Sequence, residues 1–429
     1  MKKFALLLAA LGLALTGLPA MADMHGCDVA APAEPVQVNF IGWTFPILDF
    51  YASEIESCNQ IENLDVNAQV LQSADAQNEM RLAASSTGAS PYDIIHGSNA
   101  FIGELAALGW LMPLNDLIDE YSEAYDLGDM SDAMYAAASL DGNIYGIPII
   151  VNTSIFMYNG DLLEAAGVEP PQTYDDVIGI CNSMALEGAG ADMGFGLVVS
   201  AGWAWRVEYV NLYGTYGGHL LDENLMPAFN SETGVAALDK LLEIVDACLG
   251  EEGVLLSTDD VQAGLANGSI AMAHIWASRA AMMDDEELSD VVGVIEFAPA
   301  LHATADTPKR GGIPWADFLA IPATSEIDKD LLFQIIMEAA DLDSQLGAAE
   351  FGLVPRNGAS ANAPRYSEAS LTTIAEGGPA IDHPAQQIAN SALGQFLPMA
   401  ATGEMTSAEA LQAAADLYVE EATAQGYIG

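Results

Sequence analysis

The chain has 429 residues, 51% of them hydrophobic, and its 61 acidic residues against 11 basic ones give a net charge of −50. This charge repels nucleic acids and anionic lipid surfaces, so neither is expected as a partner. Because the acidic residues are dispersed among many apolar ones, the composition indicates a folded rather than a disordered protein. We interpret the charge as a solvated acidic surface suited to a salty medium, with cation binding as the alternative.

The first 22 residues, MKKFALLLAALGLALTGLPAMA, have the pattern of a secretory signal peptide cleaved near Ala22. A membrane anchor is the alternative, but the apolar run is shorter than the roughly 20 residues that span a bilayer. Cleavage leaves 407 of the 429 residues and removes Lys2 and Lys3, so the net charge becomes −52. At about 100–200 residues per domain, two domains or lobes are expected in an exported, periplasmic protein.

Four cysteines, an even number, are expected to form disulfides in an exported chain, and their spacing fits no zinc motif. Order along the chain favours Cys27 with Cys58 and Cys181 with Cys248, among three possible connectivities. The second pair lies on two apolar helical faces, in 173–187 and 231–249, that can pack together. Buried free thiols are the alternative.

Strand and helix patterns alternate in the first quarter of the chain, which predicts a parallel α/β sheet. The expected strands are 36–43, 64–73 and a short one in 91–99, and the expected helices are 47–58, 73–88 and one ending at Gly109. In such sheets ligands meet the loops that leave the carboxyl ends of the strands. Trp43 and the loop His96–Asn99 are therefore candidate walls of a site.

The middle of the chain has a turn followed by a long extended run near residues 140–160, a segment suited to crossing between lobes. Beyond it come an aromatic stretch, a strand that leads into a helix, and a β-prone region around a Gly/Pro/Lys/Arg loop. The expected elements are helices 173–187 and 231–249, the aromatic stretch 203–216, the strand and helix in 266–282, the β-prone region 291–322, and helices 326–341, 384–400 and 406–424.

Four segments, taken in order, resemble the family 1 extracellular solute-binding proteins of ABC importers, the group that includes maltose-binding protein. They are PYDIIHGSNAFIGELAALGWLMPL, LDGNIYGIPIIVNTSIFMYNGDLLEAAGVEPPQTYDDV, LANGSIAMAHIW and GGIPWADFLAIPATS. They occur in the order that the family has, and the resemblance extends from about residue 36 to residue 356, which is most of the chain that remains after cleavage. The AGW stretch near 201 and the Trp element near 315 resemble the sugar and polyol binders within this family.

The resemblance implies an α/β, two-lobed periplasmic binding protein fold of type II, with hinge strands and a ligand cleft between the lobes. By analogy the N-terminal lobe comprises residues 36–151 plus 300–343, and the C-terminal lobe comprises 152–299 plus 344–429. Closure on a ligand also forms the surface that docks on a membrane permease. Delivery to a transporter favours a monomer.

A sugar has apolar C–H faces that flat aromatic rings can cover, and hydroxyls that amides, carboxylates and guanidinium groups can bind. The ligand-binding residues that the resemblance implies are Trp43, Asn99, Asn152, Trp203, Trp276, Arg279, Trp315, Asp317 and Arg356. Asn152 occupies the hinge-strand position at which maltose-binding protein has an acidic residue that contacts the ligand. Because Asn152 is an amide, it is not expected to bind hydroxyls in the same way. A turn-stabilising role for Asn99 and packing or ion-pair roles for the tryptophans and arginines are the alternatives.

Three further conspicuous residues are interpreted as structural. Trp110 is expected in the core, Trp205 in the core or on the surface of its lobe, and Arg81 in an ion pair. Arg206, in the stretch SAGWAWRV, is expected either to hold its loop against nearby acidic residues or to touch the solute.

The sequence thus predicts the substrate-binding component of an ABC transporter that captures a sugar or polyol, with no cofactor and no metal. A charged solute in the same fold, either a polyamine or quaternary amine or a sugar phosphate or acid, is the alternative. A secreted glycoside-acting enzyme would need only two carboxylates. However, the chain has no GxSxG, HExxH, Walker or GxGxxG motif, and the family resemblance argues against an enzyme.

Overall fold

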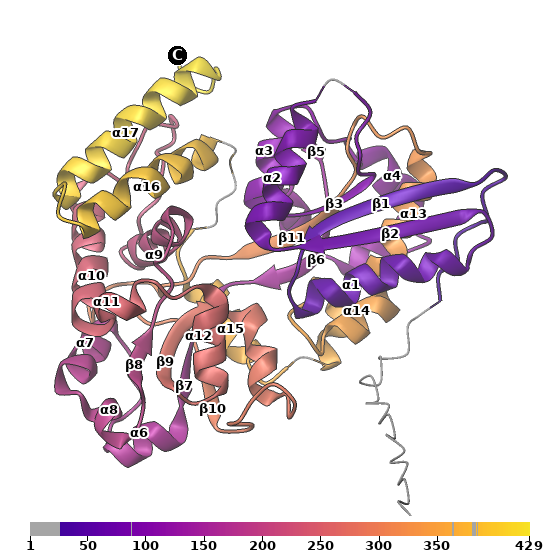
Figure 1. The fold of residues 1–429 in the computed structure, drawn as a ribbon. Helices are drawn as coiled ribbons and strands as arrows, with labels where there is room; N and C mark the ends of the chain where they lie inside the picture. Colours follow the sequence, from indigo (N-terminus) through magenta and orange to yellow (C-terminus); the bar gives the residue numbers. More distant parts are fainter. Residues whose placement is uncertain (1–25, 87, 363, 380–382, 384) are drawn as a thin grey trace, which may run out of the picture.

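The computed structural model describes residues 26–429 except 87, 363, 380–382 and 384, so the predicted signal peptide lies outside the described residues. The chain forms two α/β lobes, each built on its own sheet (Figure 1). A five-stranded sheet has the order β2-β1-β3-β11-β6, and a four-stranded sheet has the order β10-β7-β9-β8. The predicted two-lobed α/β architecture is confirmed.

The first lobe places helices on both faces of its sheet, as the alternating strand and helix patterns predict. Its strands are β1 (Val36–Trp43), β2 (Leu64–Leu71), β3 (Ile94–Ser98), β4 (Ser139–Leu140), β5 (Asn143–Ile144), β6 (Ile147–Asn152) and β11 (Trp315–Ala320). Its helices are α1 (Pro46–Ser57), η1 (Cys58–Gln60), α2 (Ser73–Ala84), α3 (Asn99–Ala107), α4 (Asn115–Tyr121), η2 (Leu127–Asp129), α5 (Asp132–Ala136), α13 (Lys329–Ala340), α14 (Leu342–Ala348) and η4 (Asn357–Asn362). One apolar core lies under α1 and α13, and another lies under α2 and α3 (Figure 1).

The second lobe also has an apolar core on each face of its sheet. Its strands are β7 (Ser154–Asn159), β8 (Met193–Gly196), β9 (Ile270–Trp276) and β10 (Ile295–Ala298). Its helices are α6 (Gly160–Ala166), α7 (Tyr174–Ser183), α8 (Ala185–Ala189), α9 (Gly202–Thr215), α10 (Glu232–Cys248), α11 (Gly250–Gly253), α12 (Thr258–Ala266), η3 (Ala277–Asp284), α15 (Ser367–Glu376), α16 (Ala385–Ala401) and α17 (Ser407–Ala424). Among the described residues, no helix is both long and apolar enough to cross a membrane.

The aromatic stretch after residue 201 is a helix, not the loop that the sequence indicates, and it packs against α16 (Figure 1). Its first residue, Gly202, touches Gly394 so closely that a Cβ atom at Gly202 would lie 2.2 Å from the carbonyl oxygen of Gly394. Two glycines therefore allow the start of α9 to rest on the backbone of α16. This contact fixes where the tryptophans of α9 lie.

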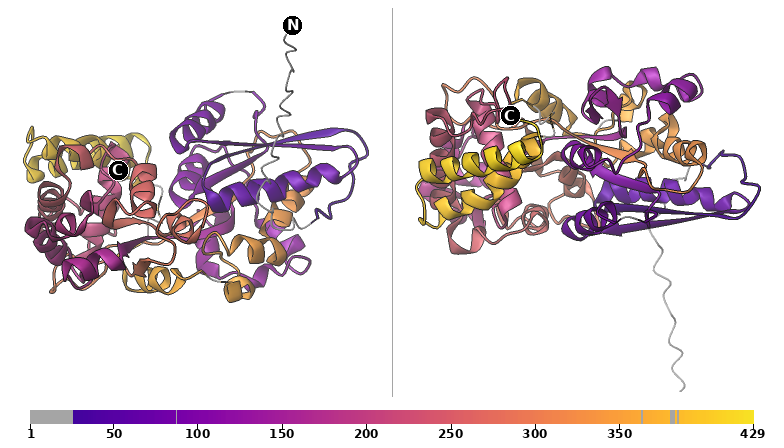
Figure 2. Two further views of the ribbon diagram at one scale, coloured as in Figure 1. Left: turned by 60° about the horizontal axis from the view of Figure 1, so that its bottom comes forward. Right: turned by 90° about the horizontal axis from the view of Figure 1, so that it is seen from above.

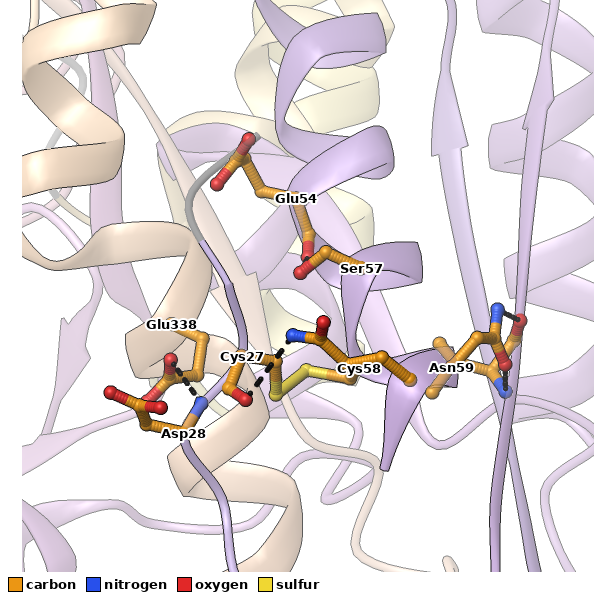
Figure 3. The surroundings of a disulfide bond; sticks show 9 residues. Cys27, Asp28, Glu54, Ser57, Cys58, Asn59 and Glu338 are labelled. Atoms are coloured by element: carbon orange, nitrogen blue, oxygen red, sulfur yellow. Dashed lines mark hydrogen bonds between the residues drawn. A yellow bond between two sulfur atoms is a disulfide. The ribbon is translucent and has the colours of Figure 1, made fainter. Parts of the chain in front are cut away.

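Both predicted disulfides are present, Cys27–Cys58 and Cys181–Cys248, with Cα atoms 4.9 and 5.2 Å apart. The first attaches the N-terminal segment to the end of α1, where Glu338 of α13 also accepts a hydrogen bond from the Asp28 amide (Figure 3). The second joins the end of α10 to α7, as the two apolar helical faces indicate.

Three segments cross between the lobes, and two lobe limits differ from the predicted ones (Figure 2). Residues Leu301 and Ile313 belong to the core of the second lobe, so the return to the first lobe comes at about Trp315 rather than at residue 300. Helix α14 packs against α1, and Phe351 lies 5.6 Å from Phe50 between ring centroids, so the last crossing comes after residue 351 rather than at 344. These corrections follow from packing contacts that join distant parts of the chain.

Candidate functional site

Predicted site residues of the first lobe meet at one edge of its sheet. Strands β1 and β6 end there at Trp43 and Asn152, and Asn99 follows the last residue of β3. Strand β11 runs the other way and begins at this edge, where Trp315 pairs with Asn152 and Asp317 pairs with the end of β3. Because parallel strands share their carboxyl edge, residues far apart in the sequence gather at the crossing to the second lobe.

Tryptophans line this crossing from both lobes. Trp276 ends β9, and its ring meets that of Trp315 edge to face, with centroids 5.7 Å apart. Trp203 lies in the first turn of α9 and is 48% exposed. An exposed indole beside an edge-to-face pair offers flat apolar surface to a ligand with C–H faces.

A small cavity of about 10 Å³ lies among Trp203, Trp276, Glu208 and His274. A cavity of this volume has room for about one water molecule, so it cannot hold a sugar. A solute would instead lie against the exposed side of the tryptophans, between the lobes.

Each lobe has a buried imidazole beside a carboxylate next to this tryptophan surface. In the first lobe, Nε2 of His96 lies 3.5 Å from Oδ2 of Asp317, and the ring of Trp43 lies 4.1 Å from that of His96. In the second lobe, Nδ1 of His274 lies 3.0 Å from Oε2 of Glu208. His96 is fully buried within β3, so it supports Trp43 and does not line a loop as the sequence indicates.

Trp315 has a polar atom without a partner. Its side chain is 8% exposed, and its Nε1 atom is buried without a hydrogen bond. An indole N–H only donates, and buried donors are nearly always paired in folded proteins. A solute acceptor in the cleft would satisfy it.

Asn152 is engaged at the crossing. Its Nδ2 donates to Oγ of Ser278 at 3.1 Å, and its Oδ1 accepts from the backbone amides of Ser278 and Thr153 at 3.2 and 3.0 Å. Ser278 follows β9 in the second lobe, so the amide ties the two lobes together at the hinge. These bonds leave Asn152 less able to bind solute hydroxyls than the prediction requires. Asn99 is only 6% exposed, so burial limits its access to a solute.

The structure places Arg356 in the first lobe, away from the cleft. It is 2% exposed, and its Nε and Nη1 atoms donate to the carbonyl oxygens of Ala340 and Asp126 at 2.8 and 3.1 Å. The prediction of a ligand contact is therefore corrected to a structural role, because the guanidinium group satisfies backbone carbonyls of two segments. Burial lowers the pKa of Arg356, and nearby tyrosine and aspartate side chains partly oppose this effect.

Arg279 lies in η3, just after Trp276, but an acidic neighbour already holds it. Its Nη1 donates to Asp259 at 2.9 Å and to Gln262 at 3.0 Å. Burial lowers the pKa of Arg279, while Asp259 and, from the first lobe, Asp49 act in the opposite direction. The prediction that Arg279 contacts ligand would require it to leave this pair or to share it.

The structural interpretations of Trp110, Trp205 and Arg81 are confirmed. Both tryptophans are buried, and Arg81 forms a two-point ion pair with Glu104 at 2.8 and 3.0 Å. Sequence reasoning missed the pair of Glu208 and His274, because 66 residues separate its members and no local pattern connects them. Across the described parts of the chain, no group of three or more His, Cys, Asp or Glu side chains has metal-binding geometry.

Residues 59–333 match the model of the bacterial extracellular solute-binding proteins. The chain belongs to this family. Its members are non-catalytic binders, and the family resemblance of the sequence is thereby confirmed.

Two relatives and one solved structure illustrate what this solute-binding protein is similar to. It is 26% identical over 225 residues to the mannitol-binding protein of Pseudomonas aeruginosa, covering 51% of this chain and 49% of the relative. It is 21% identical over 225 residues to a probable amino-acid ABC transporter periplasmic-binding protein of Sinorhizobium fredii, covering 51% of each. The chain thus spans about half the length of the curated relatives it matches.

The solved structure is that of an ABC transporter solute-binding protein from Agrobacterium vitis with bound D-mannitol. It superposes with a TM-score of 0.76 at 21% identity, covering 92% of this chain and 99% of that one. At this identity the superposition shows the shared two-lobed fold.

Proposed function

We propose that this protein is the solute-binding component of an ABC importer and that its solute is a carbohydrate, a sugar or polyol, held between the lobes. The observation that carries the proposal is the set of tryptophans at the crossing, with the edge-to-face pair Trp276 and Trp315 beside exposed Trp203. Aromatic faces cover C–H surfaces, and the unpaired Nε1 of Trp315 offers a donor to a hydroxyl. A mannitol-binding relative and a mannitol-bound neighbour support this solute class.

The mechanism follows from the two lobes and their crossings. A solute that contacts Trp43 and Asp317 on one side and Trp203 and Trp276 on the other favours the closed arrangement, because only closure brings both sets onto it. Closure would form the surface that a membrane permease recognises. The protein acts in the periplasm as a monomer, after removal of the signal peptide near Ala22.

A thermal-shift panel tests the proposal. A solute that binds only the folded protein stabilises it, by about 2.7 kcal/mol when the solute concentration is 100 times its Kd. The melting temperature therefore rises with solute concentration. Mannitol, sorbitol and common mono- and disaccharides form one arm, and spermidine, a quaternary amine and amino acids form the others. We expect a shift in the carbohydrate arm, whereas shifts confined to amines or amino acids would contradict the proposal.

A further inference from the structure

Arg206 differs from every other arginine of the chain, all of which the structure describes. The other five donate to acidic side chains or backbone carbonyls: Arg81 to Glu104, Arg279 to Asp259, Arg310 to Glu376, Arg356 to Ala340 and Asp126, and Arg365 to Asp284. Arg206 makes no hydrogen bond or ion pair with the residues that the structure describes, although its Nη1 atom is buried. In a chain with 61 acidic residues, an unpaired guanidinium group is a specific feature.

Arg206 lies on the side of α9 that carries Trp203, because residues three apart on a helix are neighbours. Two charged residues of the first lobe, Arg81 of α2 and Glu104 of α3, lie near enough to act electrostatically on Arg206. Burial and, to a smaller extent, Arg81 lower the pKa of Arg206 to about 10, while Glu104 acts in the opposite direction. Arg206 therefore faces the ion pair of Arg81 and Glu104 across the space between the lobes.

The local charge at this place is positive. Both carboxylate oxygens of Glu104 already accept hydrogen bonds from Arg81, so two guanidinium groups face one occupied carboxylate. Of two other described acidic groups at the crossing, Glu208 lies 3.0 Å from Nδ1 of His274, and Asp317 lies 3.5 Å from Nε2 of His96. An anion placed here would balance a charge that the folded chain leaves unbalanced.

Closure of the lobes makes this balance important. A neutral solute would bury Arg206 with no counter-charge, and burying an unpaired ion is costly. A planar anionic group can instead accept two parallel N–H bonds from a guanidinium group, and such charge-assisted bonds are about twice as strong as neutral ones. The same argument applies to a carboxylate and to a phosphate.

We propose that the solute is an acidic carbohydrate, with one anionic group bound by Arg206 and with Arg81 reinforcing this contact from the opposite lobe. The inference rests on the proposed function, because the tryptophans would hold the carbohydrate portion. It assigns Arg206 as a specificity-determining residue, and of the two roles expected from the sequence it selects contact with the solute.

Matched pairs of solutes that differ in one charged group test the inference by calorimetry. The pairs are mannonate and mannitol, gluconate and sorbitol, and galacturonate and galactose, with sorbitol 6-phosphate as the phosphate arm. In the pair that binds, we expect the acidic member to bind at least tenfold more tightly than the neutral one. Comparing the carboxylates with sorbitol 6-phosphate shows which anionic group the site prefers. Equal or tighter binding of the neutral member overturns the inference and leaves the proposed function intact. Failure of all carbohydrates to bind overturns the proposed function and the inference with it.

Arg206→Gln tests the assigned residue. We expect this variant to lose at least tenfold in affinity for the acidic member, to bind the neutral member at least as tightly as the wild type does, and to melt no lower than the wild type without solute. Arg365→Gln is the matched control, because it removes the same charge from an arginine that pairs with Asp284. The inference is overturned if Arg206→Gln weakens the binding of the acidic and the neutral member equally. It is also overturned if Arg206→Gln and Arg365→Gln change the affinity for the acidic member equally.

Discussion

Trp315 shows how one side chain can serve both packing and binding. Its ring meets Trp276 edge to face, while its buried Nε1 has no partner. The ring contact belongs to the fold, and a phenylalanine would preserve much of it. The Nε1–H donor has no partner in the described structure, so a hydrogen-bond acceptor of the solute would engage it.

We therefore expect Trp315→Phe to weaken binding of the preferred carbohydrate by about 1 kcal/mol, or roughly fivefold in Kd, through loss of one hydrogen bond. Isothermal titration calorimetry measures this change directly. Trp110→Phe is the control, because Trp110 is buried in the first lobe and should affect stability but not affinity. A Trp315→Phe variant with unchanged Kd would assign the indole to packing alone.

At the scale of elements, helices α16 and α17 support the position of α9, which carries Trp203 and Arg206. Helix α17 starts with a capping box in which the Glu409 carboxylate accepts hydrogen bonds from the backbone amide and hydroxyl of Thr406 at 2.9 and 2.8 Å. These bonds favour the ionised form and lower the pKa of Glu409 from its ordinary value of 4.5. The cap therefore links the stability of this helix pair to pH.

We expect Glu409→Gln to lower the melting temperature at pH 7. A lowered folded-state pKa stabilises the fold fully above the unfolded-state pKa, and this contribution is lost as pH falls through the folded-state pKa. The difference between wild type and variant should therefore shrink as the pH falls below about 4.5, measured by calorimetric melting. Glu420→Gln, an exposed change in the same helix outside the capping box, is the control for the loss of one negative charge. A constant difference at all pH values would contradict the role of the carboxylate.

At the scale of the whole molecule, the net charge of −50 opposes compaction of both lobes. Few of the acidic residues have basic partners, because the chain has only 11 lysines and arginines. Repulsion among exposed charges falls as salt shortens the screening length, from about 10 Å at 0.1 M to about 3 Å at 1 M. Stability should therefore depend on ionic strength.

We expect the melting temperature of the solute-free protein to rise between 0.1 and 1 M NaCl, as followed by differential scanning calorimetry. A sucrose series of matched osmolality is the control, because sucrose is excluded from protein surfaces but does not screen charge. A melting temperature that stays constant or falls with NaCl would contradict a surface dominated by charge repulsion.

The sequence by itself determined the two-lobed class, most strands and helices, and both disulfide pairs, because alternation, helical periodicity, capping residues and cysteine order are local signals. The sequence also placed Trp43, Trp276 and Trp315 near strand ends, from which the sheet brings them together. Only the tertiary structure decided that the stretch after Gly202 is a helix resting on Gly394 of α16.

The tertiary structure also decided the roles of the arginines. Arg356 bonds to the carbonyl oxygen of Asp126, 230 residues away, while Arg206 forms no ion pair with any acidic side chain that the structure describes. Scarcity in the sequence makes each arginine conspicuous, but it does not say which one the fold neutralises. The physical reason is that an ion pair depends on distance in space, and the packing of distant segments sets that distance.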